Sequence, residues 1–124
     1  TSFQASLSSF LALALKRRVV VCGDMLELGE ESAKYHYKLG QEIGRMGNID
    51  AVVCVGAESR QILKGVEKEN GGISGYYFES TAKASEFLHT FLKSGDGVLI
   101  NGSRGMHMEE IVEELRACFT HSLS

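Results

Sequence analysis

Short apolar runs alternate with longer segments of helical periodicity along this chain. The apolar runs lie near residues 18–22, 51–55, 75–78 and 97–100, and they are rich in Val, Ile, Tyr and Phe. Runs of this length and composition are typical of buried strands. The segments between them repeat apolar residues at the spacing of a helix face. The pattern therefore predicts repeated β-α-β units.

Several of the intervening segments carry a clear apolar stripe, and one such stripe precedes the first strand. Positions three or four residues apart share one face of a helix, so each stripe is expected to face the core. Charged residues occupy the other positions and are expected to face water. The stripes are Phe3, Leu7, Phe10, Leu11 and Ala14; Tyr35, Leu39, Ile43 and Met46; Ala84, Phe87, Leu88, Phe91 and Leu92; and Met108, Ile111, Val112 and Leu115.

The strand-like runs are apolar at successive positions and therefore on both faces. Such strands belong to parallel sheets that are covered by helices on both sides, and right-handed crossovers fix their handedness. A chain of 124 residues is long enough for one core and too short for two. We therefore predict a single α/β domain over residues 1–124, with a Rossmann-like, mostly parallel, doubly wound sheet and helices on both faces.

The composition excludes several classes of partner. With 44% apolar and 23% charged residues, the chain lies near the average of soluble globular proteins, and it has no apolar run long enough to cross a bilayer. The net charge is −3, and the one basic cluster, residues 16–18, is expected to be a solvated helix end. We expect neither a nucleic acid nor a membrane as partner.

The cysteines and the chain ends indicate the cellular setting. Cys22, Cys54 and Cys118 have no C-x-x-C spacing, and two of them lie in predicted buried strands. They are expected to be reduced core thiols. Residues 1–15 lack the order of a secretion signal, so a cytoplasmic location is predicted. The start at Thr1 without a methionine suggests a piece of a longer polypeptide.

Two loops are expected to share one edge of the predicted sheet. Residues 23–29 (GDMLELG) follow the first strand, and residues 101–106 (NGSRGM) follow the last. Each strand is expected to be fully buried, and each loop precedes a helical pattern. In open α/β sheets, ligands bind in the crevice beyond the carboxyl ends of the strands. Function is therefore to be sought in these two loops.

The second loop has the chemistry of an anion site. Gly102 would let a ligand approach the backbone, Ser103 could cap the following helix, and Arg104 offers a planar fork of donors. With a helix amino terminus, these groups suit a carboxylate or a phosphate. The alternative is that Ser103 is only a cap and Arg104 only a solvated surface charge. The sequence leaves both interpretations open.

The first loop is acidic, and its role is also open. Asp24 and Glu27 could orient a metal-bound phosphate or an attacking amine, or they could cap the helix that starts near Glu30. His36 could reach back to this loop or be an ordinary packed, hydrogen-bonded residue. The turn at residues 56–60 (GAESR) is a third candidate, although a simple helix start is the favoured interpretation.

The sequence contains neither a P-loop motif nor the G-x-G-x-x-G spacing after the first strand. We therefore expect no phosphate cradle within this chain. His89, His107 and His121 show no ligand spacing with the cysteines, so no metal site is predicted.

Residues 17–32 (RRVVVCGDMLELGEES), with His36 and Gly40 following, resemble the carboxyl-terminal domain of the Mur ligases that add D-alanyl-D-alanine. Residues 102–106 (GSRGM) and 108–112 (MEEIV) resemble the final loop and helix of the same domain. The resemblance spans nearly the whole chain, with both motifs in the same order.

The resemblance implies the lid and amino-acid-binding domain of an ATP-dependent carboxylate-amine ligase of peptidoglycan synthesis. Such an enzyme joins D-alanyl-D-alanine to UDP-N-acetylmuramoyl-tripeptide through an acyl phosphate. ATP and Mg²⁺ would be bound mainly by a central domain that this chain lacks. The implied partners are the central and amino-terminal domains of the same polypeptide, and the isolated domain is expected to be inactive.

The resemblance also implies roles for residues of the two loops. One group would lie on the nucleotide and acyl-phosphate side, and the other would face the incoming dipeptide, with an arginine on its carboxylate. The first group is Asp24, Met25, Glu27 and His36, and the second is Asn101, Gly102, Ser103 and Arg104.

The chain departs from the family pattern at two places. Family members enter this domain through a motif like Asp-x-Tyr-Asn-Ala-Asn-Pro, followed by a helix that residues 1–7 resemble, so the chain is expected to begin just after that motif. Asn101 stands where a lysine often precedes Gly-Ser-Arg. The competing hypothesis is thus a free-standing α/β binding module without catalytic activity. A phosphorylated receiver domain fits less well, because it needs an acidic cluster near Asp24 and a lysine at position 101.

Overall fold

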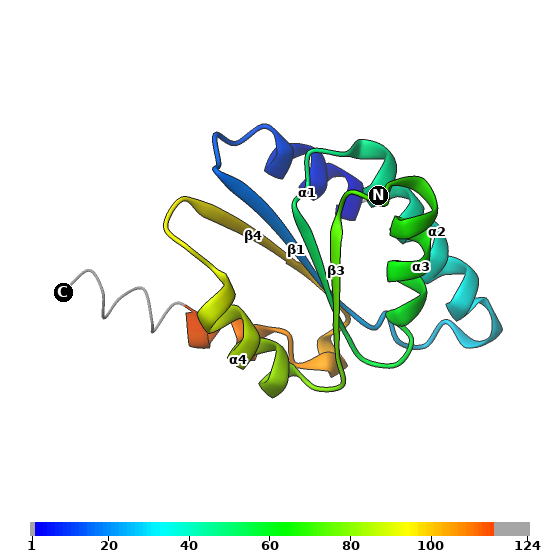
Figure 1. The fold of residues 1–124 in the computed structure, drawn as a ribbon. Coiled ribbons are helices and arrows are strands. Elements are labelled where there is room, and N and C mark those ends of the chain that lie inside the picture. The colour runs from blue at the N-terminus through cyan, green and yellow to red at the C-terminus, as the bar shows by residue number, and fades with distance from the viewer. Residues whose placement is uncertain (1, 116–124) are drawn as a thin grey trace.

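The computed structural model describes residues 2–115, without the side chains of Ser2 and Arg104. Its centre is a four-stranded sheet in the order β3-β2-β1-β4, in which every neighbouring pair is parallel (Figure 1). The strands are β1 (Arg17–Gly23), β2 (Ala51–Val55), β3 (Ser74–Phe78) and β4 (Asp96–Asn101). Each coincides with a predicted apolar run, so the predicted parallel α/β sheet is confirmed.

Helices cover both faces of this sheet, as predicted. Helices α1, α2 and α3 lie on one face, and α4 lies on the other together with a helical segment at residues 109–115 (Figure 1). The helices are α1 (Ser2–Leu11), α2 (Ser32–Met46), α3 (Arg60–Glu69) and α4 (Thr81–Phe91), and the 3₁₀ turns are η1 (Gly29–Glu31) and η2 (Arg104–Met106). Within residues 2–115, we find no helix that is both long enough and apolar enough to span a lipid bilayer.

The strand order creates a switch point between β1 and β4. From β1 the chain adds β2 and then β3 on one side, and it returns to add β4 on the other side of β1. At the carboxyl end of this pair, Cys22 of β1 is in register with Asn101 of β4. Connections that leave in opposite directions open a crevice at such a point, where ligands of open α/β sheets bind. The two candidate loops start here.

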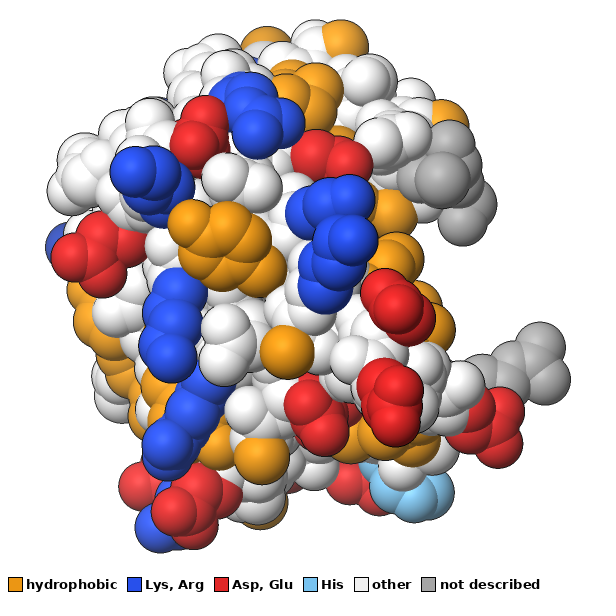
Figure 2. All heavy atoms as spheres, turned by 90° about the vertical axis from the view of Figure 1, so that its right-hand side faces the viewer, with side chains coloured by type: hydrophobic (Ala, Val, Ile, Leu, Met, Phe, Trp, Pro, Cys, Tyr) orange, Lys and Arg blue, Asp and Glu red, His pale blue; other side chains and the backbone are white. Residues whose placement is uncertain are grey.

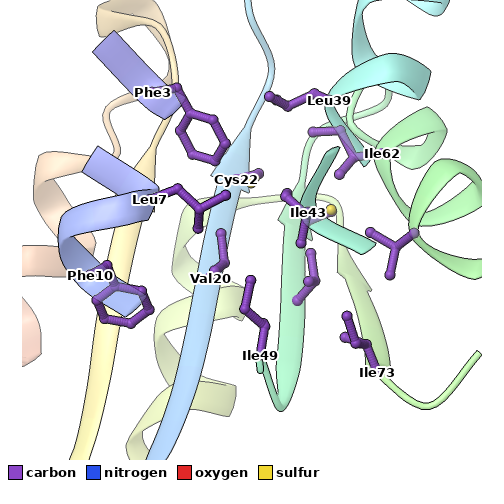
Figure 3. Packing of buried hydrophobic residues seen from close by; sticks show 13 residues of the cluster. Phe3, Leu7, Phe10, Val20, Cys22, Leu39, Ile43, Ile49, Ile62 and Ile73 are labelled. Carbon is purple, nitrogen blue, oxygen red and sulfur yellow. The ribbon is translucent and has the colours of Figure 1, made fainter. Parts of the chain in front are cut away.

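The core consists of one apolar layer on each side of the sheet. On one side, Phe3, Leu7 and Phe10 of α1 pack beside Val20 of β1, with residues of α2 and α3 completing the layer (Figure 3). Strand β1 is fully buried from Val19 onward, as predicted, because it has neighbours on both edges and helices on both faces.

Strand β4 differs from the prediction of a fully buried strand. All of its residues are only half-buried, because β4 is an edge strand of the described sheet and has one neighbour. Its amino end is held to β1 by Arg17, whose Nε and Nη2 donate to the two carboxylate oxygens of Asp96 at 3.1 Å and 2.7 Å. Arg17 Nη2 also donates to the carbonyl of Phe91. This clamp fixes the β1–β4 pair at the end opposite the switch point.

The predicted apolar stripe of α2 is partly wrong. Leu39 and Ile43 are buried, but Tyr35 and Met46 are each 41% exposed. Close packing explains the difference, because a Cβ on Gly40 would lie 1.9 Å from a backbone oxygen of α3. Helix α2 therefore turns its glycine face, rather than the line through Tyr35 and Met46, toward α3.

The stripes of the other helices are largely confirmed. Ala84 and Leu88 of α4 are buried, as are Met108, Ile111 and Leu115. Ala14 is an exception, because α1 ends at Leu11 and Ala14 is exposed.

The outer surface of α2 and α3 carries charges of both signs. Figure 2 shows this face, where Lys and Arg side chains lie among Asp and Glu side chains and scattered apolar atoms. Lys34, Lys38 and Arg45 of α2 are exposed, as their helical spacing predicts. One ion pair joins the two helices across this face, with Arg45 Nε 3.0 Å from Glu69 Oε1.

Candidate functional site

The two candidate loops are joined at the switch point. The Ser103 amide donates to the carbonyl of Asp24 at 3.1 Å, and the Ser103 hydroxyl accepts from the Leu26 amide at 2.9 Å. A Cβ on Gly102 would lie 3.2 Å from the Gly23 Cα, so glycine permits this approach. The structure thus brings the loops together as predicted. The Ser103 hydroxyl, for which capping of the following helix was one open interpretation, holds the first loop.

Asp24 points away from the shared surface of the loops. Its side chain is largely buried, and Oδ1 accepts the Ser59 amide at 2.7 Å. Ser59 directly precedes α3, so the Asp24 carboxylate fills the position at which a helix amino terminus attracts an anion. It lies against Gly56, where an added Cβ would be 2.6 Å from Oδ2. Asp24 therefore caps α3 and not the helix near Glu30.

His36 reaches back from α2 to the first loop, as one of its two interpretations predicts. The ring is fully buried. Its Nε2 accepts the Met25 amide at 3.0 Å, and its Nδ1 lies 2.7 Å from the Ser32 carbonyl oxygen. A carbonyl oxygen can only accept, so Nδ1 carries the proton and Nε2 is the acceptor. His36 is thus a hydrogen-bonded structural residue of the loop and does not face solvent.

Glu27 is the acidic group that the first loop presents to solvent. It is exposed, and its φ of 65° places it in the left-handed region that L-residues rarely adopt. Leu26 beside it is 41% exposed, and Met25 is half-buried. Of the candidate residues in the first loop, Glu27 and Met25 therefore have surface that a ligand could contact.

The second loop presents half-buried residues. Asn101, Gly102 and Ser103 are each partly accessible, and η2 begins at Arg104. The Arg104 side chain lies outside what the structure describes, so its pairing with a carboxylate stays a prediction. Leu26 lies against η2, because a Cβ on Gly105 would be 2.7 Å from Leu26 Cδ1.

The turn at residues 56–60 is the start of α3, which confirms the favoured interpretation. It nevertheless contributes residues that the sequence reading missed. Ser59 supplies the amide for Asp24, and Glu58 accepts the Ser32 hydroxyl at 3.0 Å. The first amides of every helix need hydrogen-bond acceptors, so a predicted helix start indicates that an acceptor lies nearby. This signal did not identify Asp24 as that acceptor.

The cysteines lie beneath the site and take no visible part in it. Cys22 and Cys54 are free and buried, as predicted, whereas Cys118 lies outside the described residues. Burial raises the pKa of the Cys22 thiol to about 12 and raises that of Cys54 as well. Both thiols are therefore protonated at neutral pH, and a protonated thiol is a poor nucleophile and metal ligand.

His89 and His107 are exposed histidines. His89 is 3.5 Å from a carboxylate oxygen of Glu114, and His107 is 3.7 Å from one of Glu109. His121 lies outside the described residues. Among residues 2–115, no group of three or more His, Cys, Asp or Glu side chains is arranged to hold a metal ion.

Comparisons with known proteins point to one family. The family model described as "Mur ligase, glutamate ligase domain" matches residues 1–104. The chain is 35% identical over 100 residues to the UDP-N-acetylmuramoyl-tripeptide–D-alanyl-D-alanine ligase of Buchnera aphidicola, covering 79% of this chain and 20% of that protein. It is 34% identical over 100 residues to the Escherichia coli ligase of the same name, covering 80% and 21%. The chain thus spans about a fifth of the length of these curated relatives.

Solved structures give the same result. MurF from Acinetobacter baumannii superposes with a TM-score of 0.75 at 28% identity, covering 92% of this chain and 25% of that one. MurF ligase from Thermotoga maritima, in complex with ADP, gives a TM-score of 0.69 at 29% identity, covering 91% and 24%.

Proposed function

The chain belongs to the Mur ligase family, and we propose that it is the carboxyl-terminal lid and amino-acid-binding domain of an ATP-dependent carboxylate-amine ligase. The proposed parent enzyme joins D-alanyl-D-alanine to UDP-N-acetylmuramoyl-tripeptide through an acyl phosphate in peptidoglycan synthesis. The observation that carries the proposal is that Ser103 joins the loops after β1 and β4 by hydrogen bonds. They meet at the switch point, where a ligand crevice is expected.

The relatives support the substrates that we propose. Those named above are ligases for UDP-N-acetylmuramoyl-tripeptide and D-alanyl-D-alanine, and the likeness covers about four-fifths of this chain. ATP as the energy source is supported by the related structure solved with ADP. The partners that we propose are the central and amino-terminal domains of the same polypeptide, in the cytoplasm.

The nucleotide and Mg²⁺ would be bound mainly by the central domain. The first loop of this chain does not offer its amides as a phosphate cradle, because His36 holds the Met25 amide and Ser103 holds the Leu26 amide. When bound, ATP supplies the phosphoryl group that activates the tripeptide carboxyl. The task of this chain is then to orient the substrates and to exclude water from the activated carboxyl as the domain closes.

The proposed roles are divided between the two loops. Arg104 binds the dipeptide carboxylate through its guanidinium fork, while Asn101, Gly102 and Ser103 form the wall beside it. Glu27 and Met25 have accessible surface, and their proposed role is to face the acyl phosphate. Asp24 and His36 belong to the same side of the site but act through the backbone that they hold.

Phosphate release by the complete parent polypeptide tests this proposal. With ATP, Mg²⁺, UDP-N-acetylmuramoyl-tripeptide and D-alanyl-D-alanine present, we expect steady turnover that stops when either the tripeptide or the dipeptide is left out. A parent polypeptide that binds these compounds without releasing phosphate would contradict the ligase. It would favour instead an α/β binding module, the role that Asn101 in place of a lysine would allow.

A further inference from the structure

Three successive residues of the first loop are each held by a different element. The Asp24 carboxylate accepts the Ser59 amide, which precedes α3. The Met25 amide donates to His36 of α2, and the Leu26 amide donates to Ser103 after β4. The hydrogen bond to Ser103 belongs to the site already described, and Asp24 is accounted for as a cap. The His36 contact holds the amide that lies between these two anchored positions.

The chemistry of the His36 contact is specific to a neutral imidazole. Nε2 must keep its lone pair to accept the Met25 amide, because a protonated Nε2 would be a donor that faces the amide donor. On the other side of the ring, Nδ1–H donates to the Ser32 carbonyl oxygen at 2.7 Å, and Nδ1 also lies 3.3 Å from the Ser32 hydroxyl, which itself donates to Glu58 Oε2. A chain of hydrogen bonds therefore runs from Glu58 in the β2–α3 loop through α2 to Met25.

The next residues show what this contact controls. Glu27 is exposed and has a φ of 65°, a conformation that persists only where the flanking structure imposes it. The fixed amides of Met25 and Leu26 lie on its amino-terminal side, and η1 begins two residues later at Gly29. The direction of the Glu27 carboxylate therefore depends on the two acceptors that hold these amides.

We propose that His36 is a positioning residue of the ligase: by accepting the Met25 amide on unprotonated Nε2, it fixes the loop that presents Met25 and Glu27 to the reacting groups. This inference rests on the proposed function for its catalytic consequence. Its structural part is that Nε2 accepts a hydrogen bond, and this part can be tested without measuring enzymatic activity. A histidine that only filled space in the core would need neither this tautomer nor this hydrogen bond.

Nitrogen NMR of this 124-residue chain at neutral pH tests the structural part. The expected result is an imidazole protonated at Nδ1 and not at Nε2, with the Met25 amide exchanging with solvent roughly ten times more slowly than the Glu27 amide, as one hydrogen bond would cause. Finding the proton on Nε2, or finding equal exchange of the two amides, would overturn the proposal. Neither measurement needs a variant to fold.

A matched pair of variants in the parent enzyme tests the catalytic part. In His36→Gln the side-chain oxygen can occupy the position of Nε2, whereas the shorter side chain of His36→Asn cannot reach it. We expect His36→Asn to lower kcat about tenfold with little change in KM, because the loss of a positioning contact reduces the stabilisation of the transition state. His36→Gln should restore most of kcat and the slow exchange of the Met25 amide.

The control is His89→Asn, which alters a surface histidine of α4 and should leave kcat unchanged. Equal kcat for His36→Asn and the unmodified enzyme would overturn the positioning role while leaving the ligase assignment intact. A parent enzyme without turnover before any substitution would instead refute the proposed function. The two failures are thus distinguishable.

Discussion

The hydroxyl of Ser103 accepts a hydrogen bond from the amide of Leu26, although 77 positions separate these residues in the chain. The contact exists because β1 and β4 are neighbours whose parallel carboxyl ends lie at one edge of the sheet. Through it, the loop that carries the acidic candidates and the loop that carries the arginine become one surface. The interpretation of the two loops as a single site depends on this relationship.

Replacing Ser103 should therefore loosen both loops at once. Ser103→Ala removes the acceptor of the Leu26 amide and should cost about 1 kcal/mol of stability, because solvent at this half-buried position can replace part of the lost bond. In the parent enzyme it should raise the KM of the dipeptide. Ser103→Thr keeps a hydroxyl and serves as the control. Steady-state kinetics in which both variants match the unmodified enzyme would show that the contact does not contribute to dipeptide binding.

Asp24 should behave as a structural residue. Asp24→Ala leaves the Ser59 amide at the start of α3 without its acceptor, and a lost buried hydrogen bond to a carboxylate costs about 2 kcal/mol. Urea unfolding of this chain measures the loss. Asp24→Asn retains a side-chain oxygen and should be less destabilised. If Asp24→Ala unfolded at the same urea concentration as the unmodified chain, the carboxylate would have to be assigned to ligand contact instead.

The interface between α2 and α3 should tolerate no side chain at two of its glycines. A Cβ would lie 1.9 Å from the Ile62 carbonyl oxygen at Gly40, and 2.1 Å from the Tyr37 carbonyl oxygen at Gly65. Alanine gains about 1 kcal/mol in helix propensity, whereas overpacking against rigid backbone costs about 3 kcal/mol or more. Each Gly→Ala variant should thus lose at least about 2 kcal/mol of unfolding free energy, measured by urea unfolding.

Gly71→Ala is the matched control for these variants, because nothing lies within 4 Å of the added Cβ. It should change stability by less than about 0.5 kcal/mol. Unchanged stability in Gly40→Ala would show that the two helices are packed less closely than described.

The clamp between Arg17 and Asp96 should make stability depend on acid pH. Hydrogen bonding from the Arg17 guanidinium, together with the Lys93 amide, lowers the pKa of Asp96 below its usual range. A carboxyl with a lowered pKa stabilises the fold above its unfolded pKa, about 3.9. This contribution is lost as the pH falls through the lower, folded pKa.

Unfolding by urea at a series of pH values checks this sign. At neutral pH, Asp96→Asn should be less stable than the unmodified chain, and the difference should shrink progressively below about pH 4. The exposed carboxylate variant Glu86→Gln should show little difference at any pH. A difference for Asp96→Asn that stayed constant down to pH 2 would mean that the residue contributes through packing and not through its charge.

The strands, and the placement of both loops at one edge of the sheet, could be predicted from the sequence. Runs such as residues 51–55 contain only apolar residues, which suit a strand covered on both faces. Parallel strands place all their carboxyl ends at one edge, so the loops after β1 and β4 had to lie at the same edge. Their direct contact follows from the strand order β3-β2-β1-β4, which apolar runs alone do not encode.

The roles of individual site residues were harder to predict, because they depend on partners distant in sequence. Asp24 is an ordinary acidic loop residue until the Ser59 amide, 35 positions away, is brought against it. The stripe of α2 was misplaced at Tyr35 for a similar reason, since the face of a helix that is buried depends on how closely α3 can approach. Hydrophobic spacing does not carry that information.

The dipeptide dependence of an Arg104→Ala variant of the parent enzyme tests the proposed site most directly. If the guanidinium pairs with a desolvated carboxylate, its loss should lower kcat/KM for D-alanyl-D-alanine, mainly by raising KM. The decrease should correspond to about 2 to 4 kcal/mol of lost transition-state stabilisation. Arg104→Lys should rescue poorly, because a point charge cannot replace the fork. Arg45→Ala, which breaks a surface ion pair on the α2–α3 face, should leave the kinetics unchanged. Equal kcat/KM for Arg104→Ala, Arg45→Ala and the unmodified enzyme would contradict the proposal that this site binds the dipeptide.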